Sequence, residues 1–445
     1  MARRDIALKH FDENRDFMQY TVQSGIERHR KGNATLTVTD REGNPISNAV
    51  IRAKQKNHEF RFGANIFMLG EFENETKNER YKERFSGLFN LATLPFYWNS
   101  LEPEQGKLRY AADSPRIYRR PAIDPCIDFC LTHGIEPKLH CLNYDNFTPD
   151  WMRDVDVNTH KRLLEKRIRE LAERYASVIP SWEVTNETFK TLGNYYQTKF
   201  YKEPDFVEWS FCTADKYLPN NRLIINDYFV FDPKQYRENR SPYFMQIERL
   251  LYKGITHLDS IGMQFHSFFP KEKEEWVAKY RYDPVYLYEV MDLYATLGTK
   301  LQITEMTIPA FSDGEEDEAV QAELLRNLYT VFFSHPAMEA AIYWNLVDGY
   351  AWKAEPGDMS VGENQYWGGL LRFDLSEKPA YRALQELFTK EWHTETECAT
   401  AENGTAGFRG FFGTYDLEIT ADGKTVIKEI SLRSDKNNVN TLVIE

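Results

Sequence analysis

The sequence predicts an α/β fold: a (β/α)8 TIM barrel with a small N-terminal β-extension and a C-terminal antiparallel β-module. Two observations indicate the barrel. Between residues 58 and 390, short apolar segments alternate with longer amphipathic ones, and polar residues gather where the apolar segments end. In such a barrel the strand ends converge on one face, where active sites lie.

Each apolar segment of this region has the length of a buried strand. The eight expected strands are 60–67, 88–97, 135–142, 179–187, 222–228, 258–266, 300–305 and 339–346. Helices are expected between them, including 160–175, 285–297 and 318–333. Strict alternation of this kind favours a closed parallel barrel over residues 58–390.

Both ends of the chain depart from the alternation. Residues 1–57 are expected to form a helix and a small β-extension, with strands over 34–39 and 49–53. Residues 391–445 are expected to form a small antiparallel β-module packed on the barrel, with a linker at 394–404. These terminal modules either bind polysaccharide or brace the barrel, and the sequence favours bracing.

Composition restricts the partners. The 445-residue chain has a net charge of −13, from 55 basic and 68 acidic residues, and no basic stripe. Nucleic acid and an anionic membrane are therefore not expected as partners. A polyanionic substrate is disfavoured, although a local patch can override net charge. The aromatic content of 14% fits a large core, and it also fits the stacking of aromatic rings on sugars.

Other features predict neither a metal nor an organic cofactor. The five cysteines follow no disulfide or metal-ligand spacing; they are Cys126, Cys130, Cys141, Cys212 and Cys398. Residues 1–20 lack the apolar core of a signal peptide, and no run of 18 apolar residues occurs. The expected location is either the cytoplasm or, if a leader has been removed, outside the cell. The sequence predicts no oligomeric state.

Two strand-end glutamates carry the chemistry. Glu187 ends the segment 182–187, and Glu305 ends the buried strand that includes Ile303 and Thr304. Cleavage of a glycosidic bond requires a proton for the departing oxygen and a partner for the cationic sugar, and two carboxyl groups supply both. If both line one pocket, repulsion raises the pKa of one, which becomes the acid. Taken singly, each could equally be a strand-end carboxylate in a salt bridge.

The residues around the two glutamates resemble glycoside hydrolase family 10, the family of retaining endo-β-1,4-xylanases. Residues 182–187 are close to its Trp-Asp-Val-Val-Asn-Glu, and residues 303–305 match its Ile-Thr-Glu. The similarity spans roughly residues 58–390. Further matching segments are 60–64, 89–90, 102–106, 140–151, 226–228, 261–266, 344–352 and 378–381.

This resemblance implies a role for each matched residue. Glu305 is expected to be the nucleophile and Glu187 the acid/base. Asn186 is expected to hydrogen-bond the hydroxyl next to the anomeric carbon. His266 is expected to hold Glu305 ionised, with Asp227 behind it.

Other side chains are expected to bind the substrate or support the site. Gln264 is expected to contact Glu187 or the sugar, and Trp344 and Trp352 to form walls of the pocket. The remaining candidates are His140, Tyr144, Asp145, Tyr97 and Trp98.

The sequence departs from the family pattern in two places. Members carry Glu-Asn-x-x-Lys-Trp after the second strand, whereas this chain has Pro95, Phe96 and Tyr97 in place of the acid, amide and lysine. The Trp-His pair of the third strand is Tyr144-Asp145. Lost hydrogen-bonding groups change which substrate a site accepts.

The interpretation is a retaining glycoside hydrolase that cleaves β-1,4-xylosidic bonds in xylan or decorated xylan, with a polysaccharide or oligosaccharide as its partner. The alternative within the same chemistry is a different β-glycoside, through exo action or on a glycoconjugate. A non-catalytic carbohydrate-binding barrel would be indicated by the loss of either glutamate, and both are present.

Overall fold

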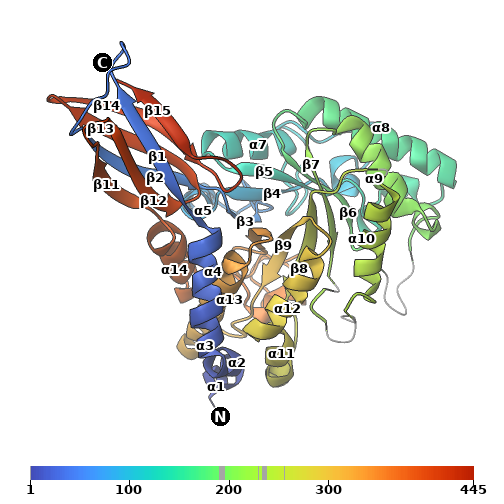
Figure 1. Cartoon of the computed structure of the whole chain (residues 1–445). Helices are drawn as coiled ribbons and strands as arrows, with labels where there is room; N and C mark the ends of the chain where they lie inside the picture. Colours follow the sequence, from blue (N-terminus) through green and yellow to red (C-terminus); the bar gives the residue numbers. More distant parts are fainter. Residues whose placement is uncertain (1, 190–195, 229, 233–237, 255, 445) are drawn as a thin grey trace.

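The computed structural model describes residues 2–189, 196–228, 230–232, 238–254 and 256–444. Eight parallel strands close into a barrel in the order β10-β3-β4-β5-β6-β7-β8-β9 (Figure 1). Their bounds are β3 Arg61–Asn65, β4 Leu91–Pro95, β5 Glu136–His140, β6 Ser181–Asn186, β7 Arg222–Asp227, β8 Ser260–His266, β9 Lys300–Thr307 and β10 Met338–Tyr343. All eight predicted strands are confirmed.

Helices surround the barrel. They are α5 Glu75–Ser86, α6 Trp98–Leu101, α7 Ile123–Thr132, α8 Val157–Tyr175, α9 Phe206–Tyr217, α10 Pro242–Lys253, α11 Glu274–Arg281, α12 Pro284–Ala295, α13 Glu315–Ser334 and α14 Pro379–Glu386. α8 begins three residues before its predicted start because the Asp156 side chain accepts from the amide of Thr159 at 3.0 Å. Asp283 caps α12 in the same way, ahead of Pro284.

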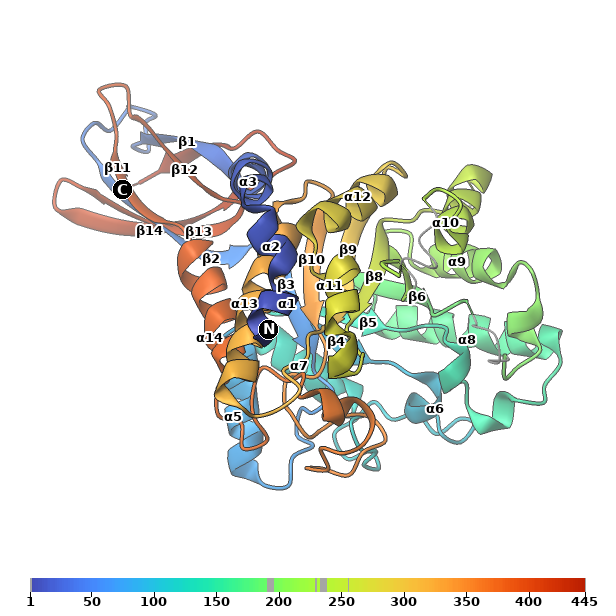
Figure 2. The same ribbon diagram turned by 90° about the horizontal axis from the view of Figure 1, so that it is seen from below.

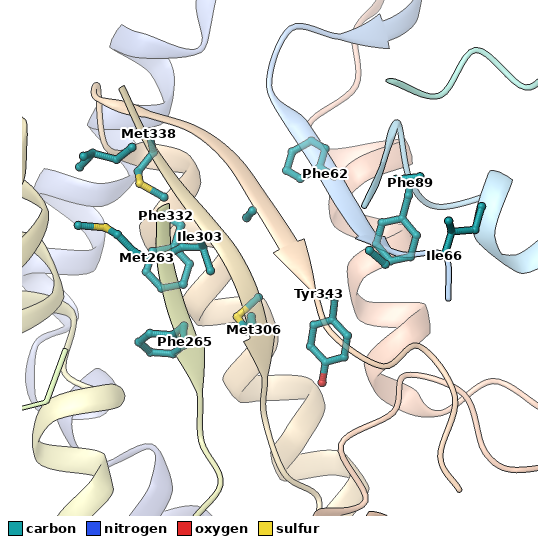
Figure 3. Close-up of a cluster of buried hydrophobic side chains, with 14 of the residues drawn as sticks. Phe62, Ile66, Phe89, Met263, Phe265, Ile303, Met306, Phe332, Met338 and Tyr343 are labelled. Carbon is teal, nitrogen blue, oxygen red and sulfur yellow. The ribbon is translucent and has the colours of Figure 1, made fainter. Parts of the chain in front are cut away.

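The barrel strands are buried on both faces, as parallel strands covered by helices must be. Figure 3 shows part of this core, with Met263, Ile303 and Phe332 packed on one side of the strands and Phe62 and Phe89 on another. Helix α13 is buried along most of its length, because it packs on β10 and is covered by α14 and the N-terminal helices (Figure 2).

The two ends of the chain form one β-sandwich. One sheet has the order β12-β1-β15 and the other β11-β2-β13-β14. The bounds are β1 Lys31–Thr39, β2 Val50–His58, β11 Glu395–Ala399, β12 Thr405–Phe411, β13 Gly413–Ala421, β14 Lys424–Leu432 and β15 Val439–Val443. The predicted linker at 394–404 is wrong, because its first half is β11, which pairs with β2. The predicted N-terminal and C-terminal β-elements form this sandwich together, since β1 pairs with β12 and β15.

Short N-terminal helices connect the sandwich to the side of the barrel (Figure 1). They are α1 Arg3–Ala7, α2 Lys9–Glu13, α3 Arg15–Phe17 and α4 Ser24–His29, with a π-helical turn at Met18–Gln23. The buried Arg3 guanidinium pairs with Glu274 at 2.9 Å and Asp317 at 3.1 Å, which ties α1 to α11 and α13. In the part of the chain that is described, no helix is both long and apolar enough to span a bilayer.

Candidate active site

A cavity of about 920 Å³ opens at the carboxyl ends of the barrel strands. Ten of the residues predicted from the sequence line it: Tyr97, His140, Tyr144, Asn186, Glu187, Gln264, His266, Glu305, Trp344 and Trp352. They come from six different strands or the segments that follow them. The structure therefore brings the two predicted carboxyl groups into one pocket.

A chain of hydrogen bonds joins the two glutamates. Nδ2 of Asn226 donates to Oε1 of Glu305 at 2.9 Å and to Oδ1 of Asn186 at 2.8 Å. Nε2 of Gln264 donates to Oδ1 of Asn186 and to Oε1 of Glu187, both at 3.3 Å. Because Oδ1 of Asn186 accepts both bonds, its Nδ2 group stays available as a donor to a sugar hydroxyl.

Glu305, which lies in β9, has two hydrogen-bonding neighbours from strands β7 and β8. Besides Asn226, the ring of His266 lies with Nε2 3.0 Å from Oε2 of Glu305 and Nδ1 3.0 Å from Oγ1 of Thr307. Burial lowers the pKa of His266 to about 4, so the ring is neutral and carries one proton. In the tautomer that carries this proton on Nε2, the ring donates to Glu305, and Nδ1 is left as an acceptor facing the Thr307 hydroxyl.

Asp227 does not support His266, and this expectation is wrong. Both nitrogens of His266 are occupied by other partners. The Asp227 carboxylate accepts from the amide of Thr188 at 2.8 Å and from its hydroxyl at 3.1 Å. It therefore fixes the backbone that follows Glu187. Glu187 itself has a φ of 49°, in a region that side chains other than glycine rarely adopt, so this segment needs such anchoring.

Burial raises the pKa of Glu305 to about 8, and the nearby Glu183 and Glu187 carboxylates add to the effect. The raised group is thus the one that the resemblance assigns as nucleophile. A carboxyl group acts as a nucleophile only when ionised, so the ionisation of Glu305 should limit activity on the acidic side. Its two donors and the positive charge that develops on a reacting sugar favour the ionised form.

We expect kcat/KM to rise with pH across the neutral range, through the pKa of Glu305. Glu187→Gln removes a neighbouring negative charge, which should lower the pKa of Glu305 and move the rising part of the pH profile to lower pH. The measurement is a pH profile with an aryl glycoside whose leaving group needs no protonation. If kcat/KM of the variant rose at the same pH as in the wild type or at a higher pH, the electrostatic coupling between the two glutamates would be refuted.

Glu187 receives a hydrogen bond that the family motif does not predict. The hydroxyl of Tyr144 donates to its Oε2 at 2.5 Å, and Nδ2 of Asn146 donates to the same hydroxyl at 3.1 Å. Burial and the Glu187 charge hold the pKa of Tyr144 well above its usual value, so the phenol keeps its proton. This hydrogen bond from Tyr144 therefore stabilises the ionised form of Glu187.

Tyr144→Phe should lower kcat/KM by about tenfold to a hundredfold for substrates with poor leaving groups, since a hydrogen bond to a charged group is worth about 1.5–3 kcal/mol. The loss should be smaller for activated aryl leaving groups, which need less protonation. Steady-state kinetics on both substrate types check this. An equal loss on both would mean that Tyr144 positions the sugar instead of acting on Glu187.

A charge network missed by sequence reasoning lies directly beneath the pocket. Nζ of Lys138 donates to Oε1 of Glu183 at 2.6 Å, and Oε2 of Glu183 contacts Nδ1 of His140. Nε2 of His140 lies 3.0 Å from the hydroxyl of Tyr97. Burial alone would raise the pKa of Glu183, but the charges of Lys138 and His140 outweigh it and lower the pKa to about 2. The sequence signal was available: Lys138 and Glu183 are charged residues inside apolar strands.

Two further predicted residues do not reach the cavity. Trp98 is 5% exposed, donates from Nε1 to Glu102 at 2.9 Å and packs edge-on against Trp151. Asp145 is 1% exposed and accepts from the amides of Gln197 and Thr198. These side chains do not line the cavity; each one secures a neighbouring segment, which leaves them a supporting position beside the site. In the case of Asp145 this is the segment after β6.

The cavity also contains residues that the sequence did not single out. Arg119, Arg120 and Phe147 line it together with Tyr97 and Trp352. The arginines lie in the connection between β4 and α7, where no strand or helix periodicity marks a position as pocket-facing. Among the described residues, no group of three or more His, Cys, Asp or Glu side chains could hold a metal ion.

A parallel (β/α)8 barrel with two hydrogen-bonded glutamates in a pocket at the strand ends defines the class of barrel glycoside hydrolases. The particular family is shown by comparison: the profile of glycosyl hydrolase family 10 matches residues 54–387. The chain belongs to glycosyl hydrolase family 10.

Curated relatives are similar at low identity. Anti-sigma-I factor RsgI6 of Acetivibrio thermocellus is 26% identical over 403 residues, which are 90% of this chain and 46% of that protein. Endo-1,4-beta-xylanase 1 of Arabidopsis thaliana is 24% identical over 94% of this chain and 40% of its own length. Endo-1,4-beta-xylanase B of Thermotoga neapolitana is 24% identical over 70% of this chain and 84% of its own. The chain thus spans less than half the length of the first two.

Experimental structures agree with the fold. Native xylanase 10B from Thermotoga maritima superposes with a TM-score of 0.58 at 24% identity, covering 75% of this chain and 96% of that one. Xylanase 10B from Thermotoga petrophila RKU-1 in complex with xylobiose gives 0.58 at 22% identity, covering 75% and 95%. At these identities the likeness supports the barrel alone.

Proposed function

We propose that this chain hydrolyses β-1,4-xylosidic bonds in xylan or decorated xylan by a retaining double displacement. The observation that carries the proposal is the hydrogen-bonded chain from Glu305 through Asn226, Asn186 and Gln264 to Glu187 inside one cavity. Membership of a glycosyl hydrolase family and the xylanases among the relatives support the same reaction.

In the first step, a carboxylate oxygen of Glu305 attacks the anomeric carbon while Glu187 gives its proton to the departing oxygen. The glycosidic C–O bond breaks and an ester between the sugar and Glu305 forms. In the second step, Glu187, now ionised, takes a proton from water, whose oxygen displaces Glu305 from the anomeric carbon. Two inversions at one carbon leave the configuration retained.

Side chains around the two glutamates bind and position the reacting sugar. Nδ2 of Asn186 is free to bind the hydroxyl beside the anomeric carbon, an interaction that strengthens in the transition state. The Trp344 ring packs edge-on against Phe67, His140 and His266, and it forms an aromatic wall beside Glu305. Such a wall packs against the apolar face of a sugar ring.

A second candidate is the same chemistry on another β-glycoside, by exo action or on a glycoconjugate. It is favoured by one observation: Tyr97, Phe147 and Trp352 pack together and bring aromatic surface to one side of the cavity. A reducing-sugar assay across xylan, arabinoxylan, β-glucan and aryl β-glycosides separates the two. Activity on xylan is the expected result; activity elsewhere without activity on xylan would overturn the xylanase assignment.

A further inference from the structure

Arg120 is a buried cation in the wall of the candidate active site. It is 3% exposed and lines the cavity. Its guanidinium lies over the rings of Tyr97 at 4.2 Å and Trp352 at 4.4 Å, with Phe147 at 5.4 Å. Aromatic rings of this kind stabilise the charge and fix the plane of the guanidinium, but they leave its N–H donors unused.

The hydrogen bonds of Arg120 are few for a buried arginine. Its single bond within the described residues runs from Nη1 to the carbonyl of its neighbour Arg119 at 2.8 Å, and its Nε is buried without a partner. By contrast, Arg109 on the same connection donates to three carbonyl groups. No carboxylate among the described residues forms an ion pair with Arg120. Glu363 acts on the Arg120 charge only at a distance, without contact. A buried charge that no carboxylate contacts is costly, so an anionic group bound against the guanidinium would stabilise it.

The charged residues that line the cavity are also compatible with an anionic ligand. Besides Arg120, its lining contains the cationic residues Arg119, Arg153, Arg281 and Lys353. Apart from the two glutamates, it contains only the carboxylates Asp232 and Glu363 among the described residues. Glu363 accepts a hydrogen bond from Nδ2 of Asn345. With the two glutamates included, the lining has five basic and four acidic side chains, so it lacks the acidic excess of a chain whose net charge is −13.

We propose that Arg120 binds the carboxylate of a uronic acid residue carried by the substrate, so that the preferred substrate is an acidic, uronic-acid-substituted xylan. This rests on the proposed function. The planar guanidinium matches a carboxylate in two parallel hydrogen bonds from its Nη1 and Nη2 atoms, while the rings of Tyr97 and Trp352 hold its plane in place. Burial lowers the pKa of Arg120 to about 10, so the group is still charged at neutral pH.

The test compares two ligands that differ only in charge. One is a xylo-oligosaccharide substituted with glucuronic acid, and the other is its carboxyl-reduced counterpart, which carries glucose at the same position. Isothermal titration calorimetry measures the affinity of both for the Glu305→Gln protein, which cannot turn them over, with and without Arg120→Gln. We expect the acidic ligand to bind about tenfold or more tightly than the neutral one, and Arg120→Gln to remove this preference.

Two control variants make the result specific. Arg116→Gln alters an arginine of the same connection that already pairs with Glu71 at 2.8 Å, outside the cavity, and should keep the preference. Arg120→Lys retains the charge but not the planar pair of donors, and should keep part of it. Circular dichroism and melting curves establish that each variant is folded. If Arg120→Gln does not fold, the two ligands are compared on Arg120→Lys instead, where an undiminished preference for the acidic ligand would overturn the proposal.

Equal affinity for the two ligands, or a preference that survives in Arg120→Gln, would overturn the proposal. The proposed function has a separate readout, the hydrolysis by the wild-type protein of xylan, both unsubstituted and substituted with glucuronic acid. Hydrolysis of xylan with no preference for the acidic ligand would refute the role of Arg120 alone. An Arg120-dependent preference without any xylan hydrolysis would support the carboxylate site and refute the proposed reaction.

Discussion

Glu305→Ala should reduce turnover of a β-xyloside by about 10⁴-fold or more, because the alanine side chain cannot form the bond to the anomeric carbon. The neighbours of Glu305 fit this role: Asn226 and His266 each direct a hydrogen-bond donor at its carboxylate. The rate should be measured with a homogeneous preparation, since a trace of wild-type protein would hide the loss.

Glu187→Ala should also lose orders of magnitude on xylan, but it should retain the first step on aryl glycosides with good leaving groups. The glycosyl-enzyme then accumulates because no base activates water. Added azide should react with it directly, form a β-glycosyl azide and restore turnover. Near-normal activity of either alanine variant would contradict the assignment. If azide instead rescued Glu305→Ala and gave a β-glycosyl azide, the two roles would have to be exchanged.

Glu183→Ala should lower the free energy of unfolding by about 3–5 kcal/mol, because it leaves Lys138 as an uncompensated charge in the barrel interior. Both side chains are fully buried and their ion pair is 2.6 Å long. The effect should depend on pH. The folded-state pKa of Glu183 is lowered to about 2, so its contribution is present above the unfolded-state pKa and is lost as pH falls toward 2.

Urea denaturation followed by tryptophan fluorescence measures this change. Glu170→Gln breaks the surface pair with Lys166, which is 2.8 Å long, and should leave stability close to the wild-type value. The double change Lys138→Met with Glu183→Leu should recover stability relative to Glu183→Ala, since it removes the unpaired charge. A loss in Glu183→Ala no larger than that in Glu170→Gln would contradict the role of the buried pair.

The barrel could be predicted from the sequence because its signal is local. Each strand is an apolar run buried on both faces, and each is followed by an amphipathic helix. The β-sandwich could be predicted only as strands. Leu36 of β1 lies opposite Ala406 of β12, and Arg52 of β2 lies opposite Glu397 of β11. Pairing between the two ends of a chain leaves no trace in local periodicity.

In the site, too, residues at strand ends could be predicted from the sequence, whereas several residues in the connecting segments could not. Glu187, Asn186, Gln264 and Glu305 lie at strand ends, where the barrel itself determines direction, and the structure places them together. Trp98 and Asp145 lie outside the strands, so hydrogen bonds made by distant segments decide where they point. Arg120 was missed for the same reason: only the folded chain brings it to Tyr97 and Trp352.

The pKa of Glu305 changes what could be inferred from the carboxyl pair. Repulsion between like charges suggests that the group with the raised pKa is the acid. Here burial in the strand raises the pKa of the expected nucleophile, and Tyr144 supports the carboxylate of the expected acid. Both carboxyl groups have hydrogen-bond donors directed at them, so the direction of the pKa shift alone does not separate the two proposed roles.

The central claim is a retaining double displacement by Glu305 and Glu187. The most direct measurement is proton NMR of the anomeric signal during the first minutes of hydrolysis of a β-linked xylo-oligosaccharide, before mutarotation mixes the products. The account predicts that the β-anomer of the new reducing end appears first and the α-anomer follows slowly. Initial appearance of the α-anomer would show inversion and would contradict a covalent intermediate on Glu305.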